Sequence, residues 1–296
     1  MPEFRTDPLT GRWILIAEGR SERPNDFTTG GRCPFCPGHE GDTPPAVLTV
    51  PSVEGAWQIR VFPNKYPAVT PQGPAYGVHE VIIEAPEHDL SFADFTVDRL
   101  QQVLEVYQSR LLSFRDDPRL QYGFLFKNHG EAAGASRIHP HSQLIALEKI
   151  PLVVEQELRA AESPTCLYCE DLKQDERIIL ETDTTTAICP AAPKFPFETW
   201  LMPKRHASHF ASSPGLAEAL HAILQKLERA TGLAAYNLGL HTAPLQAGEL
   251  HYFHWRLEII PRLTRIAGFE LGTGVYIHEI SPERAARILR ENRLIV

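Results

Sequence analysis

The chain lacks a surplus of positive charge: 29 lysines and arginines stand against 37 aspartates and glutamates, for a net charge of −8 over 296 residues. Nonspecific nucleic-acid binders need a basic surface, so this balance argues against that class. No apolar run approaches the roughly 20 residues needed to span a bilayer, and the first residues show no cationic leader before an apolar stretch. We therefore expect no nucleic-acid partner, no membrane segment and a cytoplasmic location.

Cysteine is also scarce, with five residues in the whole chain. Four of them form two C-x-x-C pairs, Cys33/Cys36 and Cys166/Cys169. In a cytosolic chain of this size such pairs favour a metal site over a disulfide. Two intervening residues let both thiolates reach one tetrahedral Zn²⁺ ion, at about 2.3 Å each. Cys189 stands alone in an apolar stretch and is expected to be a buried core thiol.

What is present is the composition of a globular protein, with 43% hydrophobic and 22% charged residues. The order of motifs occurs twice. Residues 33–147 contain a C-x-x-C pair, an extended segment, a helical stripe and a histidine-rich strand, and residues 166–260 repeat that order. Apolar residues at three-to-four spacing predict a helix over 100–111 and another over 216–227, with Ser213 as N-cap of the second. Internal duplication is the simplest account.

Runs between each cysteine pair and its helix predict strands, at 57–62, 78–84 and 199–202. Strands adjacent in sequence favour hairpins and meanders, hence antiparallel sheets with few helices. Residues 148–165 have a helical middle and connect the copies. We predict an α+β fold with two tandem repeats, residues 1–150 and 151–296, each an antiparallel sheet flanked by helices.

Each cysteine pair needs two further ligands, and histidines occur at matching places in both copies. A single histidine is more often a partly buried imidazole, but four ligand types repeated in the same order favour metal. A Cys₂His₂ set leaves no open position for water, so both zinc sites are predicted to be structural. The predicted ligands are Cys33, Cys36, His88 and His139 in the first copy, and Cys166, Cys169, His206 and His254 in the second. Histidines without a counterpart, such as His79, are expected to be surface or supporting groups.

The copies diverge in one string. His139-Pro-His141-Ser-Gln143 in the first corresponds to His254-Trp-Arg256-Leu-Glu258 in the second. If His139 and His254 bind metal, His141 is left free, and imidazole can attack phosphorus and carry the transferred group. Arginine stays protonated and cannot be a nucleophile, so the second repeat is predicted to be catalytically silent.

The segment around His141 is typical of a nucleotidyl-transfer site. Neutral His141 would attack the α-phosphorus of a nucleotide sugar and expel the sugar phosphate, and a second phosphate-bearing acceptor would then take the nucleotidyl group. The Gln143 amide, the Ser136 hydroxyl and the backbone of residues 134–136 are placed to stabilise charge on the phosphoryl oxygens. The alternative is that Gln143 and Ser136 are ordinary polar residues of a strand and a loop.

These motifs resemble the galactose-1-phosphate uridylyltransferase family, a two-repeat branch of the histidine-triad superfamily. The likeness runs from RTDPLTGRWILIA at 5–17 through RVFPNKYP, FKNHG…HPHSQ and FETWLMPKRH to GFELGTG at 268–274. It implies two histidine-triad-like repeats, ping-pong exchange through a nucleotidylated His141, a Glu270 that reaches hexose hydroxyls, and a homodimer. It also implies nucleotide contacts, at Arg60, Asn64, Asn128, Gly134, Ser136 and Gln143.

Two departures bear on the substrate. Ser142 stands where the family has glycine, and Arg256 where many members have a second histidine. With the FELGTGVYI ending, these make the chain similar also to plant-type ADP-glucose phosphorylases. We favour UMP exchange between a nucleotide sugar and a hexose 1-phosphate. Adenylyl transfer to inorganic phosphate, a histidine-triad hydrolase and a non-catalytic, zinc-stabilised nucleotide-binding module remain as alternatives.

Overall fold

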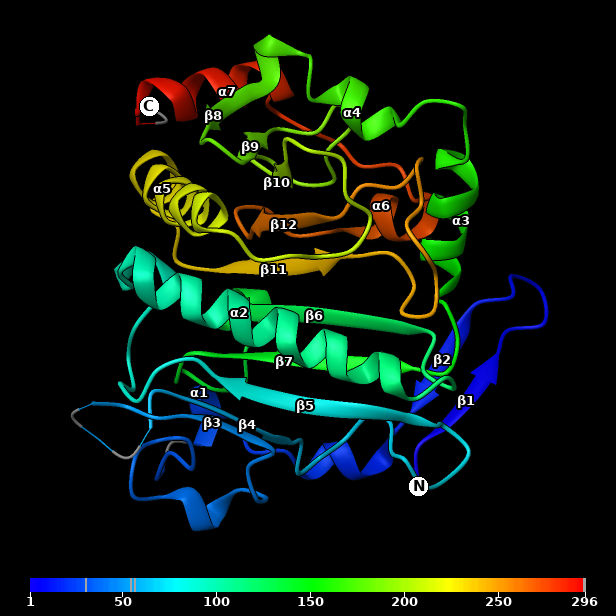
Figure 1. Ribbon diagram of the computed structural model, residues 1–296, viewed down its shortest axis with the longest axis vertical. Helices are drawn as coiled ribbons and strands as arrows, with labels where there is room; N and C mark the ends of the chain where they lie inside the picture. The colour runs from blue at the N-terminus through cyan, green and yellow to red at the C-terminus, as the bar shows by residue number, and fades with distance from the viewer. Residues whose placement is uncertain (30, 54, 56, 295–296) are drawn as a thin grey trace.

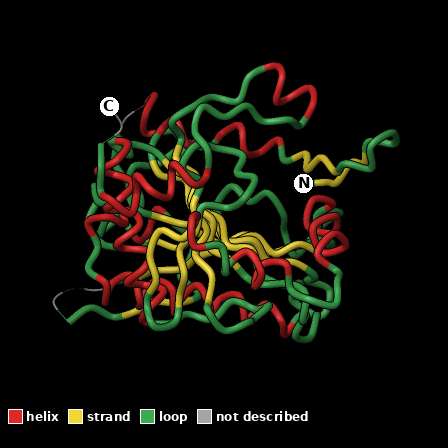
Figure 2. Tube along the Cα trace, turned by 90° about the horizontal axis from the view of Figure 1, so that it is seen from above, coloured by secondary structure: helices red, strands yellow, loops and turns green. Residues whose placement is uncertain are grey.

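A computed structural model describes residues 1–29, 31–53, 55 and 57–294 of the chain. These residues form one ten-stranded sheet and a separate two-stranded hairpin. The hairpin, β1 (Glu3–Thr6) and β2 (Trp13–Ile16), projects from the body of the molecule (Figures 1 and 2). No helix in the described part of the chain is both long and apolar enough to cross a membrane.

The ten strands divide equally between the two halves of the sequence. The first half contributes β3 (Leu48–Val50), β4 (Ile59–Pro63), β5 (Gly77–Ile83), β6 (Tyr122–His129) and β7 (His141–Leu147). The second contributes β8 (Ile178–Glu181), β9 (Thr185–Ile188), β10 (Thr199–Pro203), β11 (Tyr236–His241) and β12 (Arg256–Pro261). The spatial order is β3-β4-β5-β7-β6-β11-β12-β10-β9-β8. From either edge inward, each half has the same chain order, which agrees with the duplication.

The two halves meet where β6 pairs with β11 in antiparallel register, with Phe126 opposite Gly239. All neighbouring strands of the sheet are antiparallel. The antiparallel sheets expected for the repeats are therefore present, and they join edge to edge into one sheet. Pairing between β6 and β11 removes the free edge that each half would otherwise expose.

The long helices are those predicted from the apolar stripes. Helix α2 (Val97–Ser113) begins after Thr96, whose side chain accepts a hydrogen bond from Arg99 N at 3.2 Å. Helix α5 (Pro214–Thr231) begins after Ser213, which accepts from Leu216 N at 3.3 Å, so the predicted cap is confirmed. The two helices pack against each other and share one apolar core with the sheet (Figure 1).

The remaining helices are shorter. They are α1 (Asp26–Thr29), α3 (Leu152–Ala161), α4 (Leu167–Asp171), α6 (Gly268–Thr273) and α7 (Pro282–Glu291). Six 3₁₀ turns accompany them in the described residues, η1 (Glu18–Glu22), η2 (Glu40–Asp42), η3 (Phe92–Asp94), η4 (Phe114–Asp116), η5 (Glu131–Ala133) and η6 (Asp175–Arg177). Helix α3 is the predicted helical middle of the connector between the repeats. Helix α7 packs on α5 and β8 at the end of the sheet farthest from β3 (Figure 1).

Candidate active site and metal centres

Strand β7 carries His141 and Gln143 in the interior of the sheet. His141 lies opposite Ile83 of β5, and Gln143 lies between Val81 of β5 and Phe126 of β6. Side chains alternate between the two faces of a strand. Leu144 and Ala146 face the core that holds α2 and α5, so His141 and Gln143 face the opposite side of the sheet.

On that opposite side lies a cavity of about 350 Å³. Four residues expected at the site line it together, Asn64, Ser136, His141 and Gln143. The aromatic rings of Phe35 and Phe62 supply apolar wall. A cavity of this volume is within the range that holds small organic ligands.

The His141 ring is held in one tautomer. Its Nδ1 lies 2.9 Å from the carbonyl oxygen of His139. A carbonyl can only accept, so Nδ1 carries the hydrogen and Nε2 keeps a free lone pair. Burial, followed by the positive charge of Lys127, lowers the pKa of His141 to about 3. The ring is therefore neutral at physiological pH, the form in which imidazole is a nucleophile.

The loop from β6 to β7 is folded tightly against the second half. Gly130 has φ of +81°, and a Cβ there would lie 2.6 Å from the carbonyl oxygen of Ala234, so glycine is required. Farther along, the Ser136 carbonyl accepts from Asp26 N at 2.9 Å, and the Asp26 carboxylate pairs with Arg137. These contacts tie the loop to α1 and fix one wall of the cavity.

Positive charge gathers at the cavity although the chain is acidic overall. Arg23, Arg32, Lys65 and Arg137 all line it, against one acidic residue of the lining, Asp42. Asp42 lies 3.4 Å from Arg32. The sequence motifs did not identify Arg23, Arg32 or Arg137 as site residues. Arg32 and Arg137 stand beside the C-x-x-C and His-Pro-His motifs, and that position was the one signal for them. Arg23 had no such signal, because it follows η1 in a loop without periodicity.

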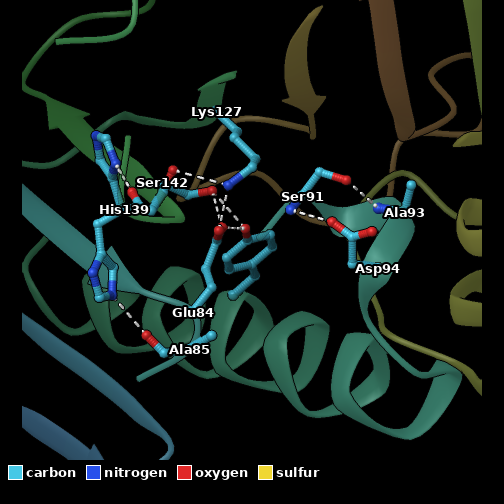
Figure 3. Close-up of polar contacts among 10 residues, drawn as sticks. Glu84, Ala85, Ser91, Ala93, Asp94, Lys127, His139 and Ser142 are labelled. Atoms are coloured by element: carbon cyan, nitrogen blue, oxygen red, sulfur yellow. Dashed lines mark hydrogen bonds and ion pairs between the residues drawn. The ribbon is translucent and has the colours of Figure 1, made fainter. Parts of the chain in front are cut away.

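A polar cluster lies behind His141, on the face of the sheet that α2 covers. Lys127 Nζ forms an ion pair with Glu84 and lies 3.3 Å from the carbonyl oxygen of His141. Glu84 also accepts hydrogen bonds from Tyr107 and Ser142. Figure 3 shows Glu84, Lys127 and Ser142 pointing toward one another. Lys127 is 1% and Glu84 0% exposed, so the peptide group of His141 is held by a fully buried ion pair.

Four of the expected contact residues do not line the cavity in the described part of the chain: Arg60, Asn128, Gly134 and Glu270. Arg60 is nearby, because its Nη2 donates at 3.1 Å to Thr43, which does line the cavity. Asn128 accepts from Asn237 of β11 at 2.8 Å, and Gly134 ends η5 with φ of +78°. Glu270 accepts from a backbone N–H at the start of α6, in the second half of the chain.

One unmatched histidine is not a surface residue. His79 of β5 is 3% exposed, and its Nε2 lies 3.0 Å from Gln143 Oε1. Of the two expectations for His79, a surface residue or a supporting group, the structure fits the supporting group. The sequence carried no signal for this contact, because it depends on the register of β5 against β7.

The first predicted ligand set converges. The ligand atoms of Cys33, Cys36, His88 and His139 all lie within 4.8 Å of one another. Cys36 Sγ lies 3.3 Å from His88 Nδ1 and 3.6 Å from His139 Nδ1. Tetrahedral Zn²⁺ with ordinary bond lengths separates sulfur and nitrogen ligands by about 3.5 Å. The outer nitrogen of His139 lies 2.8 Å from the Ala85 carbonyl oxygen, an orienting contact typical of metal-bound histidine (Figure 3).

The second ligand set has the same geometry. The ligand atoms of Cys166, Cys169, His206 and His254 lie within 4.8 Å of one another. Cys169 Sγ lies 3.5 Å from Nδ1 of both His206 and His254. Burial raises the pKa of Cys169 to about 12, so a cation is needed to stabilise its thiolate. Both clusters can hold a metal ion with four protein ligands.

In the second repeat, Arg256 corresponds to His141, and its side chain is packed among other residues. Arg256 Nη1 donates to Glu157 of α3 at 2.5 Å, and the same Glu157 oxygen accepts from Tyr168 at 2.5 Å. The Arg256 guanidinium also lies over the Trp200 ring, 4.5 Å from its centroid. The guanidinium is thus engaged by a carboxylate and aromatic rings.

The family model described as galactose-1-phosphate uridyl transferase, N-terminal domain, matches residues 56–151. An ADP-glucose phosphorylase from Arabidopsis thaliana is 34% identical, over 98% of this chain and 93% of its own length. The chain belongs to the galactose-1-phosphate uridylyltransferase family. It is an enzyme of the nucleotidyltransferase class. The resemblance read from the motifs is confirmed.

Both branches of the family are close in sequence and structure. A galactose-1-phosphate uridylyltransferase from Thermotoga maritima is 26% identical, over 99% of each chain. The crystal structure of the Arabidopsis ADP-glucose phosphorylase with bound ADP-glucose superposes with a TM-score of 0.83, at 35% identity over 98% of each chain. A uridylyltransferase structure gives the same TM-score of 0.83, at 28% identity over 99% of this chain and 98% of its own. The expected fold class is confirmed.

Proposed function

We propose that the protein exchanges a nucleoside monophosphate, UMP in the favoured version, between a nucleotide sugar and a hexose 1-phosphate through a nucleotidyl-His141 intermediate. One observation carries the proposal. His141 presents a free Nε2 lone pair in a cavity lined by four cationic side chains. A neutral nucleophile beside concentrated positive charge suits attack on the α-phosphorus of the pyrophosphate in a nucleotide sugar.

In the first half-reaction, the Nε2 lone pair forms a bond to the α-phosphorus while the bond from that phosphorus to the bridging oxygen breaks. The electron pair leaves with the sugar 1-phosphate. In the second, a phosphate oxygen of the acceptor attacks the same phosphorus and the N–P bond breaks, which restores neutral His141. Sugar phosphate is a weakly basic leaving group, so stabilising charge matters more than protonation.

The proposed substrate contacts follow from position. Arg23, Arg32 and Arg137 would neutralise the phosphates, and the Gln143 amide and Ser136 hydroxyl would donate to phosphoryl oxygens. Asn64 would contact the nucleotide. Arg60 would support the same wall through Thr43. Asn128 and Gly134 would shape the loop from β6 to β7.

We assign Zn²⁺ to both Cys₂His₂ clusters. Thiolate and imidazole ligands in a tetrahedral set favour zinc, and four protein ligands leave no open position, so the ions would be structural. The zinc next to His139 would hold the start of β7 and so support His141. None of the five cysteines forms a disulfide, which supports a cytoplasmic location.

We further propose a division into a catalytic repeat, residues 1–150, and a silent repeat, residues 151–296, and a homodimer. The closed environment of Arg256 supports the silence of the second repeat. Glu270 lies outside the lining of the His141 cavity, so a Glu270 that contacts the hexose would come from a second copy.

A second candidate is adenylyl transfer to inorganic phosphate, with ADP-glucose as donor. Its support is the 34% identity to an ADP-glucose phosphorylase, against 26% to the uridylyltransferase from Thermotoga. Both candidates use the same histidine chemistry and differ in base and acceptor.

One experiment tests the function and separates the candidates. The protein is incubated with UDP-glucose or ADP-glucose without acceptor, and intact mass is measured under conditions that preserve the N–P bond. We expect a uridylyl adduct from UDP-glucose, discharged by galactose 1-phosphate. A dominant adenylyl adduct discharged by phosphate would establish the second candidate. No adduct with either donor would reject the His141 mechanism.

A further inference from the structure

The buried histidine of β5 receives a hydrogen bond whose direction is known. The backbone N–H of Ala68 lies 3.0 Å from His79 Nδ1, and a backbone N–H can only donate. His79 Nδ1 therefore accepts and carries no hydrogen. Burial lowers the pKa of His79 to about 4, so the ring is neutral. In a neutral imidazole with a bare Nδ1, the hydrogen is on Nε2.

That hydrogen determines which atom of Gln143 faces His79. Nε2 of His79 lies 3.0 Å from the Gln143 side chain, and since Nε2 donates, the atom opposite must be the amide oxygen. The orientation of the Gln143 amide thus follows from the Ala68 N–H through a chain of defined donors and acceptors.

Asn64 holds the same oxygen from a second direction. Tyr66 N donates to Asn64 Oδ1 at 2.8 Å, which turns Asn64 Nδ2 toward Gln143 Oε1 at 3.4 Å. Asn64 Nδ2 also lies 3.1 Å from His79 Nε2. Both nitrogens carry hydrogen, so this is an approach of two donors to one shared acceptor. The Gln143 oxygen is occupied twice, and its NH₂ group is left for the cavity that Gln143 lines.

We propose that His79 is a positioning residue that orients the Gln143 amide so that its NH₂ group, and not its oxygen, meets the phosphoryl oxygens of the substrate. The inference rests on the proposed nucleotidyl transfer at His141. The terminal torsion of glutamine is broad and nearly two-fold, so an unrestrained amide would present either end. An amide oxygen turned toward a phosphate would repel it, whereas the NH₂ group stabilises the charge that develops there.

Two substitutions separate this role from simple support of the loop. His79→Gln places an amide nitrogen near the position of Nε2, so it can still donate to Gln143, but it gives up the bond to Ala68. His79→Asn places an oxygen near the position of Nδ1, so it keeps the Ala68 contact and loses the donor to Gln143. The readout is the single-turnover rate at which donor nucleotidylates His141, with melting temperature measured in parallel.

If His79 positions Gln143, His79→Asn slows nucleotidylation by about 10-fold or more, while His79→Gln stays within about 3-fold of wild type. Gln143→Ala is expected to cost about 10²-fold, the scale of one lost donor to a developing oxyanion. Adding His79→Asn to Gln143→Ala should then cost no further rate. That combination of results supports the proposal.

The reverse order, with His79→Gln slower than His79→Asn, would assign His79 to the loop and overturn the inference. Independent, multiplying losses in the double variant would overturn it as well. A Gln143→Ala enzyme at the wild-type rate would remove the role of Gln143 and this inference with it, while an adduct on His141 still stood. Absence of any adduct in the wild-type protein would instead reject the proposed function itself.

Discussion

The two repeats place different chemistry on the same strand positions. Gln143 lies opposite Val81 in the first, and Glu258 lies opposite Trp200 in the second. Two residues before Val81 stands His79, and two residues before Trp200 stands Glu198. The first repeat thus has two uncharged side chains, His79 and Gln143, beside the cavity. The second has two carboxyl groups bridged by the Trp200 N–H, 3.1 Å from Glu198 and 3.3 Å from Glu258.

The face toward the helices differs in the same way. Ser142 of β7 joins a buried ion pair, whereas Leu257, at the corresponding place in β12, belongs to the apolar core. Equivalent strand positions of the two repeats therefore keep the same register while their side chains differ in polarity. On this face the first repeat buries the Lys127–Glu84 ion pair next to His141, whereas the second repeat buries the apolar Leu257.

The largest expected effect is the loss of nucleotidyl exchange when His141, the residue that most distinguishes the two repeats, is replaced. His141→Ala should lower nucleotidyl exchange by more than about 10³-fold, because it removes the imidazole proposed to carry the nucleotidyl group. The measurement is turnover together with adduct mass.

The matched variant adds Arg256→His to His141→Ala, which places an imidazole in the second repeat. We expect no adduct there, because Glu157 and the aromatic rings occupy the surroundings. An adduct at residue 256 would contradict a silent second repeat.

The metal clusters should respond alike in both repeats. Cys33→Ser and Cys166→Ser should each remove about one equivalent of zinc and lower the free energy of unfolding by several kcal/mol, because metal binding is coupled to folding. Elemental analysis and chemical denaturation measure the two effects. Cys189→Ala is the control for zinc content, since Cys189 belongs to the apolar core and not to either cluster. If the wild-type protein contained no metal, or were as stable without metal as with it, both zinc sites would be rejected.

The buried ion pair behind His141 can be broken on one side or removed. Lys127→Met leaves Glu84 buried without its cation, at an expected cost of about 3–5 kcal/mol in unfolding free energy. The double variant Lys127→Met, Glu84→Leu should recover much of that loss, because it removes both charges. Urea denaturation measures both. A single variant as stable as wild type would show that the pair is not the support described here.

The smallest effect concerns the carboxyl pair of the second repeat. Burial, followed by Glu258, raises the pKa of Glu198 to about 7 from its ordinary 4.5. The folded state then binds more protons than the unfolded state between these pH values, so stability is full below about pH 4.5 and is lost as pH rises toward 7. His241, 2.9 Å from Glu258, and Arg256 also face the pair.

Glu198→Gln should remove this slope, a change on the order of 2 kcal/mol across the window. The measurement is unfolding free energy at pH 5 and pH 7. Glu228→Gln, on the exposed side of α5, is the control and should leave the slope unchanged. A Glu198→Gln protein with the wild-type slope would place the titrating proton elsewhere.

Much of the fold was readable because its signals are local. Apolar spacing predicted α2 and α5, and the Ser213 cap marked where the latter begins. The metal clusters were readable because each ligand type recurs in order. The join of β6 to β11 was not, because strand pairing between distant segments leaves no periodic trace in either one.

The site divides along the same line. His141 and Gln143 stand in a string whose change between repeats made them visible. Arg23 and Arg32 reach the cavity from loops, and nothing in loop sequence predicts direction. His79 was expected to be a surface or supporting group because no histidine matches it in the second repeat, where Glu198 stands in the equivalent place. A comparison of the repeats by residue type does not pair His79 with Glu198, whereas the strand register does.

The pairing of β6 with β11 limits how the protein can be cut into separate fragments. Each strand is an interior strand only because the other covers its hydrogen-bonding edge. A fragment that ended after β7 would carry a bare, eight-residue β6, free to recruit the same strand from another molecule. We expect such a half to persist in solution only as a self-paired species or to precipitate, whereas the intact chain covers that edge with its own β11.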